Sequence, residues 1–278
     1  MSLAVFLAVL CAAALHATWN ALIKFGGDKL QGMFLLSLGH GILALGMIAY
    51  FPAPDPASYG WLAASVAFHL FYKTMLTLAY QRGDLSRVYP IARGTAPLLV
   101  VIISLMFLAD PLTTFAVVGV ALASFGILMM ARGVFTSGEN RSLLPFALLS
   151  AVGTMGYSIA DGLGARASGD PSGYVGWLFL LDAMIFMIVA MFIRGRSIWK
   201  IQTRDWVSGL LAGVLSVLAY WIAVWAMTKA PIAMVTALRE TSVLFAVCIG
   251  VVFLGEKFDR TKLLAALFIA TGVIAMRL

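Results

Sequence analysis

The sequence has few charged residues. Asp, Glu, Lys and Arg make up 11% of the 278 residues, whereas hydrophobic residues make up 62%. Soluble domains contain about a quarter charged and about half apolar residues. A chain of this length cannot bury so much apolar surface in one core, so the composition excludes a soluble fold and predicts an integral membrane protein.

Segments of alternating polarity are also lacking. The strands of a membrane barrel would appear as runs of roughly 10 alternating residues. The apolar runs instead extend for about 20 residues, the length that crosses a bilayer as a helix. We therefore predict an all-α membrane protein with ten transmembrane helices. The predicted helices span residues 3–23, 30–51, 59–80, 86–108, 112–131, 143–165, 173–193, 206–228, 231–254 and 261–277.

Cysteines and long connections are scarce. Cys11 and Cys248 both lie within apolar runs, which makes a disulfide framework implausible. The first run lacks the basic start of a secretory signal, so we expect a mature helix. No connection is long enough for a soluble domain, and neither a phosphate-binding glycine loop nor a His-Glu-x-x-His string occurs. We expect no cofactor, no metal site and no catalytic residues.

The basic residues lie mainly between the apolar runs. The net charge is +7, but the Lys and Arg residues form no basic patch, which argues against a nucleic-acid partner. Thirteen Lys and Arg residues fall in the odd-numbered connections and three on the opposite side. Cytoplasmic connections carry the excess of positive charge, so both termini should be periplasmic and the protein should lie in the inner membrane. The thirteen are Lys24, Lys29, Arg82, Arg87, Arg132, Arg141, Arg194, Arg196, Lys200, Arg204, Lys257, Arg260 and Lys262, and the three are Arg166, Lys229 and Arg277.

An internal repeat relates the two halves of the chain. Shifting the second half by 146 residues aligns segments of the fourth and ninth helices without a gap. Because each half has five helices, an odd number, the second copy is inverted in the membrane. We predict a 5+5 inverted repeat, with residues 1–135 and 136–278 forming one transport domain. The aligned segments are 91–95 with 237–241, 107–110 with 253–256, 125–127 with 271–273 and, more weakly at a shift of 141, 16–20 with 157–161.

Three short motifs resemble the drug/metabolite transporter superfamily, in its EamA-like ten-helix branch. They are His16-Ala-Thr-Trp-Asn20, Tyr80-Gln-Arg-Gly-Asp-Leu-Ser86 and Leu254-Gly-Glu-Lys257. The resemblance implies a central cavity lined by helices 1, 3, 4, 6, 8 and 9. It leaves the substrate open, since the superfamily includes amino-acid and cationic-drug exporters, sugar-phosphate exchangers and choline importers. The small cationic-drug exporters of the superfamily use a glutamate in helix 1, and the first helix here has no carboxylate.

Two arginines occupy matching positions of the repeat. Arg93 and Arg239 lie inside the fourth and ninth helices, where an unpaired charge is costly. Two guanidinium groups facing one cavity would bind a carboxylate, phosphate or phosphonate. The alternative is structural pairing, with Glu240 beside Arg239 and with Asp161 or Asp182 neutralising Arg93. Asp182 ranks lower as a site residue because the resemblance places its helix at the periphery.

A polar stripe follows the third helix at spacings of three and four residues. Such a stripe faces a pathway or neighbouring helices and not lipid. We expect Lys73 and Tyr72 to contact substrate, and His69 is a candidate for binding a coupling ion. The stripe comprises His69, Tyr72, Lys73, Thr77 and Tyr80.

Further polar pairs share helix faces at a spacing of four residues. His16 with Asn20, and Tyr157 with Asp161, are candidates for substrate contact. His16, Asp161 and Glu240 are also candidates for proton coupling, because each can change charge within the membrane. An interhelical hydrogen bond is the structural alternative for each.

Aromatic side chains and prolines complete the candidate site. Trp19, Tyr89 and Trp221 are expected to contact substrate, with Trp225 a further candidate, although packing is the alternative. Pro90 and Pro97 predict a kinked or mobile fourth helix.

These features predict a secondary transporter for a small anionic or zwitterionic metabolite, such as an amino acid, organic acid or phosphonate. Export, proton coupling and exchange are the modes considered, and lipids, the metabolite and protons are the expected partners of a monomer or homodimer. An exporter of cationic or aromatic compounds is one alternative, and a lipid flippase or accessory subunit is another. An enzyme is not expected because the intramembrane carboxylates are dispersed over separate helices.

Overall fold

The computed structural model describes residues 1–278 except 26–27, 83–84, 109, 132–140 and 255–259. All regular structure in the described residues is helical. Parts of two motifs, at 83–84 and 255–257, lie outside the described residues. The helices are α1 (Leu3–Phe25), α2 (Lys29–Tyr50), η1 (Pro56–Ser58), α3 (Tyr59–Tyr80), α4 (Leu85–Phe107), α5 (Thr114–Met129), α7 (Leu143–Ala167), α8 (Pro171–Arg194), η2 (Gly195–Trp199), α9 (Thr203–Met227), α10 (Ile232–Arg239), α11 (Ser242–Leu254) and α12 (Arg260–Arg277).

Each of the ten ranges predicted from the sequence contains described helix. Within the described residues, eight segments are long and apolar enough to cross a membrane. The helices outside these eight are α5, which has only 16 residues, and α12, whose 18 residues include Arg260, Lys262 and Arg277. Helix α4 continues through both of its prolines.

The continuous helix predicted over residues 231–254 is corrected, because α10 ends at Arg239 and α11 begins at Ser242. At the break, the amides of Glu240 and Thr241 donate to carbonyls three residues earlier, which is the tighter 3₁₀ pattern. The Thr241 hydroxyl also donates to the Leu238 carbonyl, at 2.7 Å. These local bonds divide the helix where four consecutive polar residues, Arg239 to Ser242, interrupt an apolar run.

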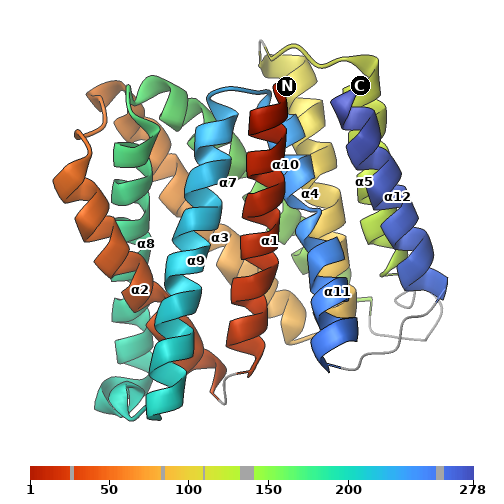
Figure 1. Ribbon diagram of the computed structural model, residues 1–278. Helices are drawn as coiled ribbons and strands as arrows, with labels where there is room; N and C mark the ends of the chain where they lie inside the picture. The colour runs from red at the N-terminus through yellow and green to blue at the C-terminus, as the bar shows by residue number, and fades with distance from the viewer. Residues whose placement is uncertain (26–27, 83–84, 109, 132–140, 255–259) are drawn as a thin grey trace.

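Helices from before residue 132 pack against helices from after residue 140. Helix α3 lies along α7, α1 along α9, α2 along α8 and α9, and α5 along α12. Figure 1 shows α5 and α12 side by side, and both chain termini at the same end of the bundle. The core is therefore built from contacts between the two parts of the sequence.

Asp28 connects the start of α2 to the end of α8. Its carboxylate accepts the Gln31 amide at 3.0 Å and pairs with Arg194 at 2.7 Å. The hydrogen bond from Gln31, followed by that from Arg194, lowers the pKa of Asp28 below its ordinary value. Because folding lowers the pKa of Asp28, its ionised carboxylate stabilises the fold at pH values above the ordinary aspartate pKa. This stabilisation is lost as the pH falls through the lowered pKa.

Two glycines let α5 and α12 touch backbone to backbone. A Cβ added at Gly119 would lie 2.6 Å from the Gly272 carbonyl oxygen, and one added at Gly272 would lie 2.5 Å from the Gly119 carbonyl oxygen. Small residues at such crossings allow close packing in membranes. Neither position has room for a larger side chain.

We expect Gly119→Ala to lower the melting temperature of the purified protein, because the added methyl group pushes two backbones apart at a cost of about 1–3 kcal/mol. Gly46→Ala is the control, since a Cβ at Gly46 meets nothing within 4 Å. Thermal unfolding in detergent compares the two. Equal melting temperatures for both variants would contradict this close contact.

Candidate functional site

A buried ion pair joins α4 to the break in the α10–α11 segment. The Arg93 Nη1 lies 2.9 Å from Glu240 Oε1, and the two residues are 8% and 2% exposed. Arg93 comes from the first part of the chain and Glu240 from the second. The structure thus pairs Arg93 with Glu240 instead of with Asp161 or Asp182, the partners considered from the sequence.

His16 of α1 extends this pair. Its Nε2 lies 2.6 Å from Arg93 Nη2. Because a guanidinium only donates, this nitrogen must accept, which leaves His16 neutral with its proton on Nδ1. The Trp19 ring packs edge-on to His16 at 5.1 Å, and the Arg93 guanidinium lies 5.2 Å from the Tyr89 ring centre.

Arg239 adds a second guanidinium beside this cluster. It is half-buried, and its guanidinium carbon lies 4.7 Å from the centre of the Tyr220 ring. Arg93 and Arg239 both lie close enough to His16 to act on it electrostatically. Among the described residues no carboxylate pairs with Arg239. Since Arg93 and Glu240 neutralise each other, Arg239 leaves the group of Arg93, Glu240 and Arg239 with one surplus positive charge.

Several buried polar atoms of this cluster have no hydrogen-bond partner in the described part of the chain. They are Trp19 Nε1, Arg93 Nε and Glu240 Oε2. Buried polar atoms are normally satisfied, and leaving them unpaired is costly. Two donors and one acceptor therefore remain available to a polar ligand.

Asp161 of α7 forms a neighbouring polar group with two tyrosines. It is fully buried and accepts hydrogen bonds from Tyr174, at 3.1 Å, and from Tyr220. Tyr220 thus contacts both Asp161 and Arg239. The His69 ring stacks on Tyr157 at 4.1 Å, so these candidates predicted on different helices lie together.

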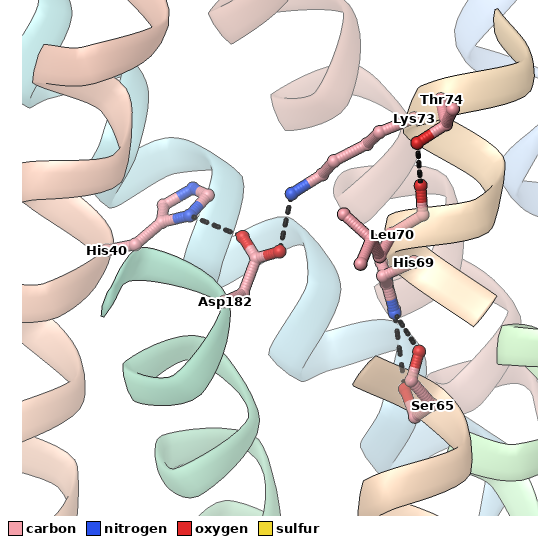
Figure 2. Close-up of polar contacts among 7 residues, drawn as sticks. All are labelled: His40, Ser65, His69, Leu70, Lys73, Thr74 and Asp182. Carbon is pink, nitrogen blue, oxygen red and sulfur yellow. Dashed lines mark hydrogen bonds and ion pairs between the residues drawn. The ribbon is translucent and has the colours of Figure 1, made fainter. Parts of the chain in front are cut away.

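Lys73 belongs to a separate cluster. It points to α8, where its Nζ donates to Asp182 (Figure 2). His40 of α2 lies on the other side of the same carboxylate, with Nδ1 3.9 Å from Asp182 Oδ2. The sequence offered no signal for His40, because it stands alone in an apolar run. Asp182, ranked low from the sequence, is the centre of this cluster.

The remaining sequence candidates divide between the clusters. Tyr72 lies near Arg93 and packs edge-on to Tyr157 at 5.7 Å. The Asn20 amide donates within its own helix, to the His16 carbonyl, at 2.7 Å. Trp221 donates from Nε1 to the Ser172 hydroxyl, at 3.1 Å, which directs it to the start of α8. No group of three or more His, Cys, Asp or Glu residues able to hold a metal is found in the described ranges.

A polar cluster ties three segments together at one end of the bundle. Arg166 of α7 donates to both carboxylate oxygens of Asp110, at 2.7 and 3.1 Å, and to the carbonyls of Met227 and Ala230, at 2.9 and 3.1 Å. Asp110 also accepts the Ile232 amide, at 2.9 Å. We call this set the Arg166 cluster. It joins the α4–α5 connection to the α9–α10 connection.

Asp110→Ala is expected to lower the melting temperature, since it leaves Arg166 and the Ile232 amide without their shared acceptor. The loss of hydrogen bonds to a charged group corresponds to about 1.5–3 kcal/mol. Asp205→Ala is the control, because Asp205 has no side-chain hydrogen bond or ion pair among those described. Thermal unfolding of both variants measures the difference, and an unchanged Asp110→Ala protein would show that the Arg166 cluster does not stabilise the fold.

The apolar helices and the charges paired between them define a multi-pass helical membrane protein. Residues 142–278 match the model of the EamA-like transporter family. This match over the second part of the chain confirms the resemblance to EamA-like members of the drug/metabolite transporter superfamily that was predicted from the motifs.

Comparison of folds gives a match over the full length. A solved structure titled only "Crystal structure of protein" is similar with a TM-score of 0.78, over 99% of this chain and 98% of its own. The two share 17% sequence identity, so this similarity shows the fold alone. No curated protein matches the sequence.

Proposed function

We propose that this chain is a secondary transporter that moves a small anionic or zwitterionic metabolite across the inner membrane. The observation that carries the proposal is Arg239, a half-buried guanidinium with an aromatic neighbour and no carboxylate partner in the described residues. A membrane protein retains such a charge at a cost. A carboxylate or phosphonate of the substrate would neutralise it.

The neighbouring atoms fit a zwitterion. A guanidinium binds a carboxylate with two parallel hydrogen bonds, and Trp19 Nε1 is a further donor that has no acceptor among the described side chains and backbone. Glu240 Oε2, an acceptor without a partner in the described residues, would receive a substrate ammonium group. An amino acid, an organic acid and a phosphonate each carry the required negative group. The surplus positive charge disfavours a purely cationic substrate.

The proposed architecture is ten membrane-spanning helices arranged as a 5+5 inverted repeat, with residues 1–135 and 136–278 as its halves. The packing supports it, because the pairing of α1 with α9 has its counterpart in the pairing of α3 with α7. The break between α10 and α11 also supports it, since transporters bind substrates where membrane helices are interrupted. We place both termini in the periplasm, from the distribution of Lys and Arg.

In this proposal, transport alternates between openings at the two ends of the bundle. The Arg166 cluster would close the periplasmic end, and its hydrogen bonds would break when that end opens. Substrate exchange or a coupled proton would supply the driving force.

A thermal-shift screen of the detergent-solubilised protein tests the substrate class. The panel contains amino acids, dicarboxylic acids, phosphonates and organic amines at equal concentration. We expect stabilisation by compounds that carry a carboxylate or phosphonate, because a ligand that binds the folded state raises its stability. Stabilisation by amines alone would contradict the proposal and favour export of cations.

A further inference from the structure

A cavity of about 490 Å³ opens beside the Arg166 cluster. Its wall is formed by the end of α7, the start of α8, and the end of α9 with the connection that follows it. Figure 1 shows this α9–α10 connection at the end of the bundle that carries both chain termini. Pockets for small molecules have volumes of about 300–1,000 Å³, so the cavity is large enough for a small metabolite.

Two groups of opposite charge in this wall have unused binding capacity. Lys229 is exposed and makes no side-chain hydrogen bond or ion pair among the described residues. Asp170 caps α8 through Oδ1, which accepts two backbone amides of the first turn at 2.7 and 2.9 Å, while Oδ2 has no partner in that part of the chain. The third charged residue of the wall, Arg166, is neutralised by Asp110. The cavity therefore offers one ammonium group and one carboxylate, which are the complement of a zwitterion.

An aromatic side chain completes the wall. Trp225 of α9 is half-buried, and no hydrogen bond from its indole nitrogen occurs within the described ranges. An indole ring packs against apolar groups and also donates a hydrogen bond. It can therefore contact the side chain of a bound amino acid while Lys229 and Asp170 hold the charged groups.

Helix α9 connects the cavity to the proposed substrate site. Trp225 lies five residues after Tyr220, the residue that contacts Arg239, and this spacing corresponds to about 7.5 Å along a helix. Trp221, one turn before Trp225, donates to the Ser172 hydroxyl in the cavity wall, at 3.1 Å. A metabolite that moves between this end of the bundle and Arg239 would meet the cavity.

We propose that the cavity is an outer binding site for a zwitterionic amino acid, with the carboxylate on Lys229 and the ammonium group on Asp170. This inference rests on the proposed transport function, in which this end of the bundle opens and closes. A carboxylate in the cavity also lies beside Arg166 and competes with Asp110 for it, so binding loosens the Arg166 cluster. Because the cavity is open to solvent, its charges are screened, and it binds more weakly than the proposed substrate site.

Protection of a cysteine from alkylation tests the outer site. Cys11 and Cys248, both exposed, are replaced by serine, and Thr228 in the cavity wall is replaced by cysteine. The Thr228 hydroxyl donates to a carbonyl of its own helix, that of Trp225, so this change leaves the contacts between helices in place. A maleimide is added to the detergent-solubilised protein with and without an equimolar mixture of the common amino acids other than cysteine, and labelling is followed by intact mass. We expect the amino acids to slow labelling of the Thr228→Cys thiol.

Three variants of this protein locate the protection. Lys229→Ala should raise the amino-acid concentration needed for half-maximal protection by about 10-fold, because it removes a charged hydrogen-bond donor. Asp170→Asn keeps an oxygen that caps α8 but loses the charge, and should weaken the protection as well. Lys200→Ala is the matched control, since Lys200 follows η2 at the other end of the bundle (Figure 1), and it should leave the protection unchanged.

Arg239→Ala separates the outer site from the proposed substrate site. Protection should persist in Arg239→Ala, because the cavity wall does not include Arg239. This expectation holds even if the transport assays find no role for Arg239, so failure of the outer site and failure of the proposed function are distinguishable. A lack of protection by the amino acids, unchanged protection in Lys229→Ala, or loss of protection in Arg239→Ala would overturn the proposal.

Discussion

Replacing Arg239 by alanine is expected to weaken binding of carboxylate-bearing metabolites by about 10- to 100-fold. Hydrogen bonds to a charged group contribute about 1.5–3 kcal/mol, and each 1.4 kcal/mol corresponds to a factor of about ten in affinity. The protein should still fold, because Arg239 is half-buried and no described carboxylate depends on it. Ligand titration followed by thermal shift measures the affinity.

Two further variants make this prediction specific. Arg239→Lys keeps the charge but loses the planar pair of donors, so its affinity should fall between those of the wild type and Arg239→Ala. Arg277→Ala removes a basic residue in the last turn of α12 and should bind like the wild type. Wild-type affinity in Arg239→Ala would show that the substrate does not bind this guanidinium.

The second large effect is expected from single substitutions of the Arg93–Glu240 pair. Arg93→Met leaves a buried carboxylate without its partner, and Glu240→Met leaves a buried guanidinium without its own. Removing one member of a buried ion pair typically costs about 3–5 kcal/mol. We expect low melting temperatures and a reduced monodisperse fraction on size exclusion for both variants.

The double variant separates pairing from packing. Combining Arg93→Met with Glu240→Met removes both charges, and apolar replacement of a buried pair is often neutral or stabilising. We therefore expect the double variant to recover most of the lost stability, while losing transport because the substrate's ammonium acceptor is gone. Single variants as stable as the wild type would contradict a structural role for this pair.

Hydropathy alone predicted the helical segments. Apolar runs of about 20 residues separated by charged connections define the helices, since only helices satisfy their backbone hydrogen bonds within lipid. Comparison of the two halves also identified Arg93 and Arg239 as matching positions. The structure places both near His16, although they have different neighbours.

The pairing of charges was not predictable from the sequence. Arg93 pairs with Glu240 and Lys73 with Asp182, across 147 and 109 residues of chain. Such partners depend on which helices pack together, and helical periodicity describes only the face of a single helix. His40 was missed for the same reason, because the charged groups near it, Asp182 and Lys73, come from other helices.

The break before α11 was also missed. The run 231–254 is mainly apolar on both sides of the polar segment 239–242, so its average hydropathy predicts one helix. The interruption arises from hydrogen bonds three residues apart and from the pairing of Glu240 with Arg93. The break therefore lies at the proposed site, because α10 ends at Arg239 and Glu240 follows directly.

Counterflow in liposomes tests the central claim most directly. Vesicles containing the purified protein are loaded with one unlabelled amino acid, organic acid or phosphonate and diluted into its labelled form. We predict transient accumulation of label for at least one of these compounds by the wild type, and none above protein-free vesicles by Arg239→Ala. Accumulation that is equal in Arg239→Ala, or absent for every acid and zwitterion in the wild type, would contradict transport through this site.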